Sequence, residues 1–198
     1  MIDIKKLNQK FQNNGGIMKT SELNSMGLSS RQIKKLLEDQ VITKIKRGYY
    51  ILSNTMPQEE VIITRMFPEA IIYLESALMY YNYTDRVPDA WQITVKKHSN
   101  PNKYNISYLP IKPFFIKEKY RKIGINSITI DNVTVKIYDR EKTICDILRY
   151  ENKLDNEIFT NAIKNYLQDK NKNIRTLMEY AKILKVDKKA QKYIGVWV

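Results

Sequence analysis

Two groups of cationic side chains stand near the start of the sequence, and their chemistry suits the phosphates and base edges of a nucleic acid. One group lies in the segment SSRQIKKLLE and the other in the segment TKIKRGYY. Arginine can pair with a guanine edge through two hydrogen bonds, whereas lysine is a flexible point charge that suits phosphates. The candidate DNA contacts are therefore Ser29, Ser30, Arg31, Gln32, Lys34, Lys35, Lys44, Lys46 and Arg47.

The same residues also allow a simpler structural interpretation. A run of charges on a helix is often only the solvated face of that helix. Ser29 and Gln32 have capping-box spacing, which gives both side chains a purely structural role. Lys44, Lys46 and Arg47 could likewise belong to a solvated hairpin. The order of the segments favours DNA binding, because a helix pair with a basic outer face is followed directly by a basic hairpin.

Two short helices and a hairpin must position these side chains. The first helix is expected to begin at Ser21 with Thr20 as its cap, and Gly27 should end it because glycine tolerates the left-handed conformation. The second helix begins at Ser29 and turns an apolar face away from its cations. That face consists of Ile33, Leu36 and Leu37. The run from Val41 to Leu52 is β-branched and aromatic with one glycine, which predicts two strands and a tight turn. This order predicts a winged helix-turn-helix, whose second helix enters the DNA major groove.

The remaining sequence predicts a second domain. A helix over 3–13 completes the first domain, which we place at residues 1–54, and residues 55–198 form the second. The second domain is expected to contain helices over 59–66 and 70–83, strands over 91–97, 105–109 and 114–117, a hairpin over 127–138 that turns at Asp131-Asn132, helices capped by Asp139 and Asp155, and helices over 174–184 and 188–197. The expected fold class is α+β: an N-terminal winged helix-turn-helix followed by an α+β domain with a small antiparallel sheet and C-terminal helices.

Composition limits the classes of partner. The chain has 198 residues with 34 Lys and Arg against 21 Asp and Glu, a net charge of +13 that favours a polyanionic partner. Ten cations and four acids give residues 1–54 a net charge of +6, so the excess is spread over both domains. The sequence contains one cysteine, no secretory signal and no apolar run of about 18 residues. We therefore expect a cytoplasmic protein with no membrane partner.

One acidic segment could suggest enzyme chemistry. Asp139, Glu141 and Asp146 lie close together in the sequence and could hold a metal ion for phosphoryl transfer. The alternative is a helix cap, a first-turn charge and an i, i+4 pair between Lys142 and Asp146. We favour the second interpretation, because Arg140 and Lys142 would neutralise a metal site.

The other reactive side chains point away from catalysis. His98 is the sole histidine, which excludes sites built on several histidines, and we expect it to be exposed. Cys145 lies between two isoleucines on a helix face and is expected to be buried. No glycine-rich phosphate loop or nucleophile-elbow motif is present. A group of four tyrosines, Tyr73, Tyr80, Tyr81 and Tyr83, could stack on RNA bases but is more typical of a core. We therefore expect no catalytic residue, no metal, no cofactor and no enzymatic activity.

Several longer segments carry a family resemblance. The hairpin ends in Lys46-Arg-Gly-Tyr-Tyr50, the segment Tyr73-Leu-Glu-Ser-Ala-Leu78 follows later, and Ile137-Tyr-Asp-Arg-Glu-Lys-Thr-Ile-Cys-Asp-Ile-Leu-Arg149 contains an Asp-Arg-Glu-x-Thr-Ile-x-Asp pattern. The tail from Asn173 to Tyr193 adds Leu177, Glu179, Tyr180 and Ala181. Together with the order of the elements, these segments resemble the AbiEi family of antitoxins, the transcriptional repressors of type IV toxin–antitoxin and phage-defence (abortive infection) operons.

The resemblance implies a function that charge and spacing do not. Members of the family repress their own operon by binding inverted repeats in its promoter. They counter a toxin of the nucleotidyltransferase type, usually without a stable complex, and the C-terminal domain is implicated in that role. Two alternatives stay open. One is a one-component regulator whose C-terminal domain senses a small ligand, and the other is a nucleic-acid-modifying enzyme that uses the winged helix to dock.

Overall fold

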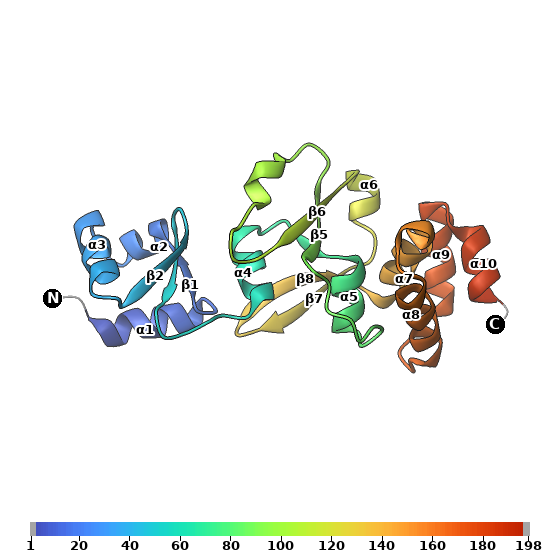
Figure 1. Ribbon diagram of the computed structural model, residues 1–198, viewed down its shortest axis with the longest axis horizontal. Helices are drawn as coiled ribbons and strands as arrows, with labels where there is room; N and C mark the ends of the chain where they lie inside the picture. Colours follow the sequence, from blue (N-terminus) through green and yellow to red (C-terminus); the bar gives the residue numbers. More distant parts are fainter. Residues whose placement is uncertain (1–2, 196–198) are drawn as a thin grey trace. The chain divides into compact units, whose positions relative to one another are not determined.

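The computed structural model describes residues 3–195 and has an α+β fold. The described residues form ten α-helices, a three-stranded sheet and a five-stranded sheet (Figure 1). They divide into two compact units, one of residues 3–69 with 128–135 and the other of residues 70–127 with 136–195. Residues 55–69 therefore group with the N-terminal elements, whereas the sequence places the domain boundary after residue 54. That boundary stays a prediction.

The first unit has four helices and one sheet. In chain order its elements are α1 (Ile4–Asn13), β1 (Ile17–Lys19), α2 (Thr20–Ser25), α3 (Ser30–Glu38), β2 (Ile42–Lys46), β3 (Tyr49–Leu52) and α4 (Glu59–Met66). The strands lie in the order β1-β3-β2 with antiparallel pairing. Their core consists of Leu7, Phe11, Met18, Leu23, Leu28, Ile33, Leu36, Ile42, Tyr50 and Leu52. The expected helices over 3–13 and 59–66 and the expected hairpin are confirmed.

The start of α2 differs from the sequence-based expectation. The helix begins at Thr20 rather than Ser21, so Thr20 is not the cap. The carboxylate of Glu22 instead accepts a hydrogen bond from the backbone N–H of Lys19 at 2.7 Å. A first-turn glutamate that reaches back in this way satisfies a free amide at the helix start. The end of α2 is as expected, since Gly27 has a φ of +86°.

The five-stranded sheet, which includes residues 128–135 of the first unit, is mixed, so the expected small antiparallel sheet is wrong. Its strands are β4 (Ile71–Ile72), β5 (Trp91–Lys96), β6 (Ile111–Ile116), β7 (Ile125–Ile130) and β8 (Val133–Tyr138), in the order β6-β5-β4-β8-β7. The pairs β5–β6 and β4–β8 are parallel, and β4–β5 is antiparallel. The segment 97–110 permits the parallel return from β5 to β6, because a parallel crossover needs about a dozen residues. This segment contains a short 3-10 helix, Pro101–Tyr104.

Two predicted elements of this unit are wrong. Residues 70–83 do not form one helix, because Ile71–Ile72 form the central strand β4 and only Leu74–Tyr80 form a helix, α5. Short apolar runs fit a buried strand as well as a buried helix. Residues 105–109 form no strand, although Ile106 and Leu109 are buried. The strand expected over 91–97 is confirmed as β5, and the one expected over 114–117 corresponds to β6, which begins earlier, at Ile111. The hairpin turning at Asp131-Asn132 is confirmed, and both turn residues have positive φ.

The remaining helices cover the core of the second unit. They are α6 (Glu118–Arg121), α7 (Arg140–Arg149), α8 (Asn156–Gln168), α9 (Ile174–Leu184) and α10 (Asp187–Tyr193), with a 3-10 turn at Glu151–Lys153. Asp139, Asp155 and Asn173 cap α7, α8 and α9 by accepting backbone hydrogen bonds. The last helix was expected over 188–197, but it ends at Tyr193, and residues 196–198 lie outside the described part. Helix α7 is the centre of this unit, with eight consecutive buried residues, 141–148.

Candidate nucleic-acid interface

Helix α3 separates an apolar face from a basic one. Ile33 and Leu36 are buried in the first unit. The exposed side carries Ser30, Arg31, Lys34 and Lys35. Lys34 lies 3.6 Å from Glu38 in an exposed i, i+4 pair that contributes little stability. Arg31 and Lys35 form no ion pair with any residue between 3 and 195. Two of the three predicted cations on α3 are thus available to an external anion.

Ser29 and Gln32 form the capping box that their spacing suggests. The Ser29 amide donates to the Gln32 side-chain oxygen at 2.8 Å, and the Gln32 amide donates to the Ser29 hydroxyl oxygen at 3.3 Å. These reciprocal bonds satisfy amides at the start of α3. They also fix the first turn, and so the direction in which Ser30 and Arg31 leave the helix. Both residues therefore have a structural role in the free protein, and their proposed contact with DNA remains a prediction.

The β2–β3 hairpin presents its three predicted cations unequally. Lys44 and Arg47 are exposed, whereas Lys46 is half-buried. The Lys46 ammonium lies 5.5 Å from the centre of the Phe67 ring, a distance at which a cation is attracted to the ring face. The turn depends on Gly48, whose φ is +82°. Lys44 and Arg47 are therefore better placed than Lys46 to meet a phosphate.

Tyr49 and Tyr50 are consecutive residues of β3, so their side chains point to opposite faces of the sheet. Tyr50 packs into the core of the first unit, and Tyr49 is half-buried with its hydroxyl donating to the Met66 carbonyl at 3.4 Å. Strand β1, which the sequence analysis did not predict, pairs with β3 and brings Lys19 opposite Tyr49. The Lys19 ammonium lies 5.9 Å from the Tyr49 ring. Lys19 is thus a further cation beside the hairpin, and the signal that could have found it is the short apolar run Ile17-Met18 after two glycines.

Glu22, the acidic residue in the first turn of α2, forms an ion pair with Arg65. Arg65 from α4 donates to Glu22 at 2.6 Å, and both side chains are partly buried. The pair neutralises Glu22, which is the acid in the first turn of α2. As a result, the negative charge of this carboxylate does not oppose the cations of the hairpin at full strength.

The acidic segment around α7 has structural partners. Asp139 caps α7, and burial raises its pKa to about 6. Glu141 accepts from the Asn173 amide at 2.8 Å, and Asp146 pairs with Lys142, both side chains being fully buried. No group of three or more His, Cys, Asp or Glu side chains in residues 3–195 could hold a metal ion. The capping and pairing interpretation of this segment is confirmed.

Arg140 is tied to the loop after α8. It donates to Asp169 at 2.8 Å and lies 4.8 Å from the Tyr81 ring. Burial alone would raise the pKa of Asp169, but hydrogen bonds from the Tyr83 hydroxyl, the Asn171 amide and Arg140 lower it to about 2. These contacts connect α7 to the end of α8.

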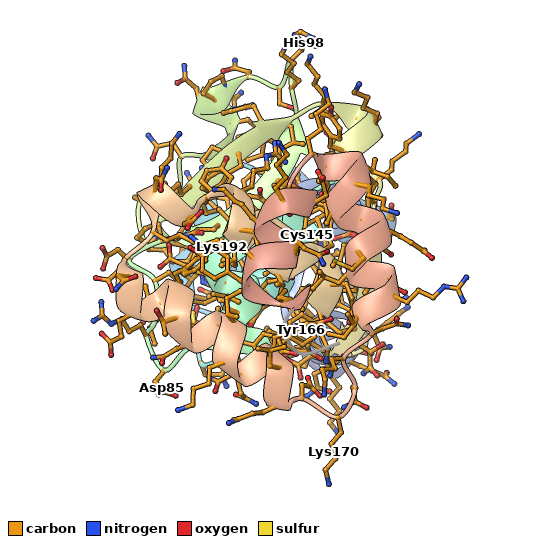
Figure 2. All side chains as sticks on the ribbon, turned by 90° about the vertical axis from the view of Figure 1, so that its right-hand side faces the viewer. Asp85, His98, Cys145, Tyr166, Lys170 and Lys192 are labelled. Carbon is orange, nitrogen blue, oxygen red and sulfur yellow. The ribbon has the colours of Figure 1, made fainter. Side chains whose placement is uncertain are left out.

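The remaining candidates for reactivity are divided between core and surface. Cys145 is fully buried, which raises the pKa of its thiol, and His98 is exposed at the periphery of the unit (Figure 2). Both positions agree with the expectation. The tyrosine group is split, because Tyr73 and Tyr83 lie in the core while Tyr80 is exposed. The four rings therefore do not form one stacking surface.

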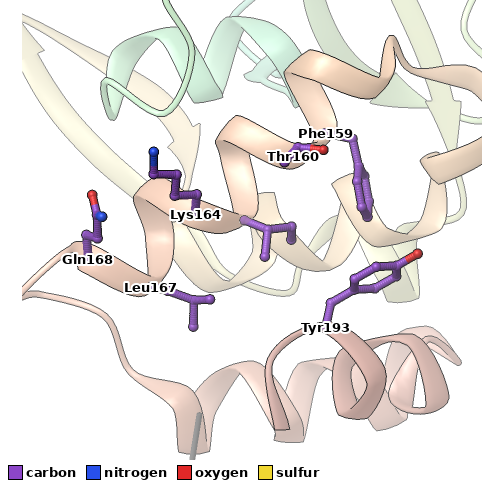
Figure 3. A pocket seen from close by; sticks show the side chains of 7 residues that line it. Phe159, Thr160, Lys164, Leu167, Gln168 and Tyr193 are labelled. Carbon is purple, nitrogen blue, oxygen red and sulfur yellow. The ribbon is translucent and has the colours of Figure 1, made fainter. Parts of the chain in front are cut away.

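Helices α8 and α10 enclose a hollow of about 410 Å³ (Figure 3). Its lining is chiefly apolar and includes Phe159, Ile163, Leu167 and Tyr193, with Lys164 as its one cation among the described lining residues. Phe159 and Tyr193 meet edge to face, 5.1 Å between ring centres. This chemistry suits packing against an apolar group and differs from that of α3 and the hairpin.

No protein-family model matches this chain, and no curated protein matches it. No helix within residues 3–195 is long and apolar enough to cross a lipid bilayer.

Proposed function

We propose that this chain is a DNA-binding transcriptional repressor that acts as the antitoxin of a type IV toxin–antitoxin operon. In this proposal residues 1–54 are a winged helix-turn-helix, α3 is the helix that enters the major groove, and the β2–β3 hairpin is the wing. The observation that carries DNA binding is the capped helix α3, which buries Ile33 and Leu36 and exposes Arg31 and Lys35, neither of which has an ion-pair partner among the described residues.

The antitoxin part of the proposal is supported by the sequence resemblance to the AbiEi family. It implies that the chain represses its own promoter at inverted repeats and counters a nucleotidyltransferase toxin without forming a stable complex. A nucleotidyltransferase encoded directly beside this reading frame would support it. An enzymatic role receives no support from the acids around α7, because their partners are a helix amide, Asn173 and Lys142.

The salt dependence of binding tests the DNA-binding proposal. The duplex is the promoter upstream of the chain's own reading frame. If about four of the exposed cations each neutralise one phosphate, doubling the salt should lower the affinity about twelvefold, because each phosphate contact adds about −0.9 to the slope of log K against log salt. Gel shifts or fluorescence anisotropy at several salt concentrations measure that slope.

Matched single variants assign the slope to particular side chains. Lys44→Ala should reduce its magnitude by about 0.9, and Lys170→Ala, which changes an exposed lysine in the loop after α8, should leave it unchanged. An affinity that does not respond to salt would contradict the proposal.

A further inference from the structure

A second basic site lies in the second unit, at one end of its sheet. A pocket of about 270 Å³ opens there between the ends of β5 and β6, helix α6 and the end of α7. Its described lining residues include three cations and four aromatic rings, and none of them is an acid. These seven residues are Lys97, Lys117, Arg149, Phe114, Phe115, Tyr120 and Tyr150.

The sheet topology explains why the cations converge. Strands β5 and β6 are parallel, and Lys96 is in register with Ile116. Lys97 and Lys117 directly follow these two residues, so both stand at the carboxyl edge of the parallel pair. Ligands of open α/β sheets bind at that edge. Arg149 is the last residue of α7 and adds the third cation.

The described acids neutralise these three cations only in part. Lys97 and Lys117 are exposed and form no ion pair with any residue that the structure describes. Arg149 lies 3.5 Å from Asp146, but this carboxylate is already paired with the buried Lys142. Three positive charges therefore face the pocket against one shared acid, which favours an anionic ligand.

The rings give the pocket a second kind of chemistry. Phe115 is 37% exposed, although apolar rings of this size are usually buried. Tyr150 packs edge to face on Phe114 with 5.7 Å between ring centres, which fixes its orientation. Tyr120 lies under the Arg149 guanidinium at 5.8 Å. Exposed rings beside cations stack on the planar bases of nucleotides and attract their phosphates.

We propose that this pocket binds a free nucleoside phosphate, with its phosphates on Lys97, Lys117 and Arg149 and its base against the aromatic rings. The volume lies just below the range of small-ligand pockets, so the pocket has room for no more than one nucleotide. The inference does not depend on DNA binding by the first unit, since it uses only residues of the second. In this proposal the second unit is a nucleotide-binding domain.

Calorimetric titration of the full chain with ATP, GTP, CTP and UTP tests the proposal. At least one nucleotide should bind with a stoichiometry near one, and it should bind at least tenfold more tightly than its nucleoside or than tripolyphosphate. The double variant Lys97→Ala/Lys117→Ala should weaken that binding at least tenfold. The matched variant Lys170→Ala/Lys172→Ala removes two exposed lysines elsewhere in the unit and should leave it unchanged.

Several results would overturn the assignment. They are the absence of binding by all four nucleotides, equal binding of tripolyphosphate, or unchanged binding in the Lys97/Lys117 variant with its circular dichroism spectrum intact. If a short single-stranded RNA binds more tightly through the same lysines, the ligand of this pocket is single-stranded RNA and not a free nucleotide. Promoter binding measured in parallel separates these outcomes from failure of the DNA-binding proposal, because the Lys97/Lys117 variant retains α3 and the hairpin.

Discussion

Replacing Arg31 and Lys35 together by glutamate is expected to lower the affinity for the promoter duplex at least about a hundredfold. A lost base or phosphate contact typically costs about 1–3 kcal/mol, and about 1.4 kcal/mol corresponds to a factor of ten. Each glutamate also repels the phosphates that the native cation would attract. Both side chains are exposed and form no ion pair within the part of the chain that the structure describes, so the fold does not depend on them. Fluorescence anisotropy with the labelled duplex measures the change.

The control must change the net charge of the chain equally. Lys170→Glu/Lys172→Glu does so in the exposed loop between α8 and α9, where Lys170 projects away from the helices (Figure 2). We expect this control to bind within about threefold of the native chain, because both lysines belong to the other unit and are not among the predicted DNA contacts. Equal losses in both double variants would show that overall charge, and not the surface of α3, governs the affinity.

Replacing Lys142 by methionine is expected to lower the free energy of unfolding of the second unit by about 3–5 kcal/mol. Removing one partner of a buried ion pair leaves the other charge poorly compensated in a low-dielectric interior, and Asp146 would keep only Arg149 at 3.5 Å. Lys142 and Asp146 are both fully buried, and the Lys142 ammonium also lies 4.3 Å from the Tyr138 ring and 5.6 Å from the Tyr73 ring. The substitution removes all three interactions at nearly constant side-chain length.

Urea unfolding followed by circular dichroism measures this loss as a lower midpoint. The double variant Lys142→Met/Asp146→Leu should recover much of the stability, because well-packed apolar residues often replace a buried pair without cost. A single variant within 1 kcal/mol of the native chain would contradict the role assigned to the pair. DNA binding by Lys142→Met at low temperature should remain, since α3 belongs to the other unit.

Local signals account for the elements that the sequence predicts correctly. The helix starts at Ser29, Asp139 and Asp155 were identified because a short polar side chain precedes each apolar pattern, and each of these side chains does accept a backbone hydrogen bond. The turn at Asp131-Asn132 was identified because both residues tolerate positive φ. These decisions depend on a few neighbouring residues, so one sequence is enough to make them.

The sheet was predicted less well because strand pairing is not local. Ile71 and Ile72 form a central strand only because β5 and β8 lie on either side of them, and nothing in the adjacent residues distinguishes this from a helix start. Strand β1 was missed for the same reason, since it depends on pairing with β3. The pocket lysines Lys97 and Lys117 were missed for this reason, because only the parallel pairing of β5 and β6 brings them together.

The sequence also did not predict which of the candidate DNA contacts are exposed. Lys44 and Lys46 are two residues apart in one strand and look equivalent in the sequence, yet Lys44 is exposed and Lys46 is half-buried against Phe67. Lys34 and Lys35 are adjacent, but Lys34 has a partner in Glu38. Such differences arise from neighbours in space, and they change the order in which the candidates should be tested.

Lysine acetylation in the presence and absence of the promoter duplex is the most direct test of the claim that α3 and the β2–β3 hairpin bind DNA. Mass spectrometry reports the reactivity of every exposed lysine in one experiment. We expect the duplex to protect Lys34, Lys35 and Lys44, while Lys170 and Lys172 keep the reactivity that they have in the free protein. Unchanged reactivity of the first three lysines at a duplex concentration that saturates the chain would contradict the claim.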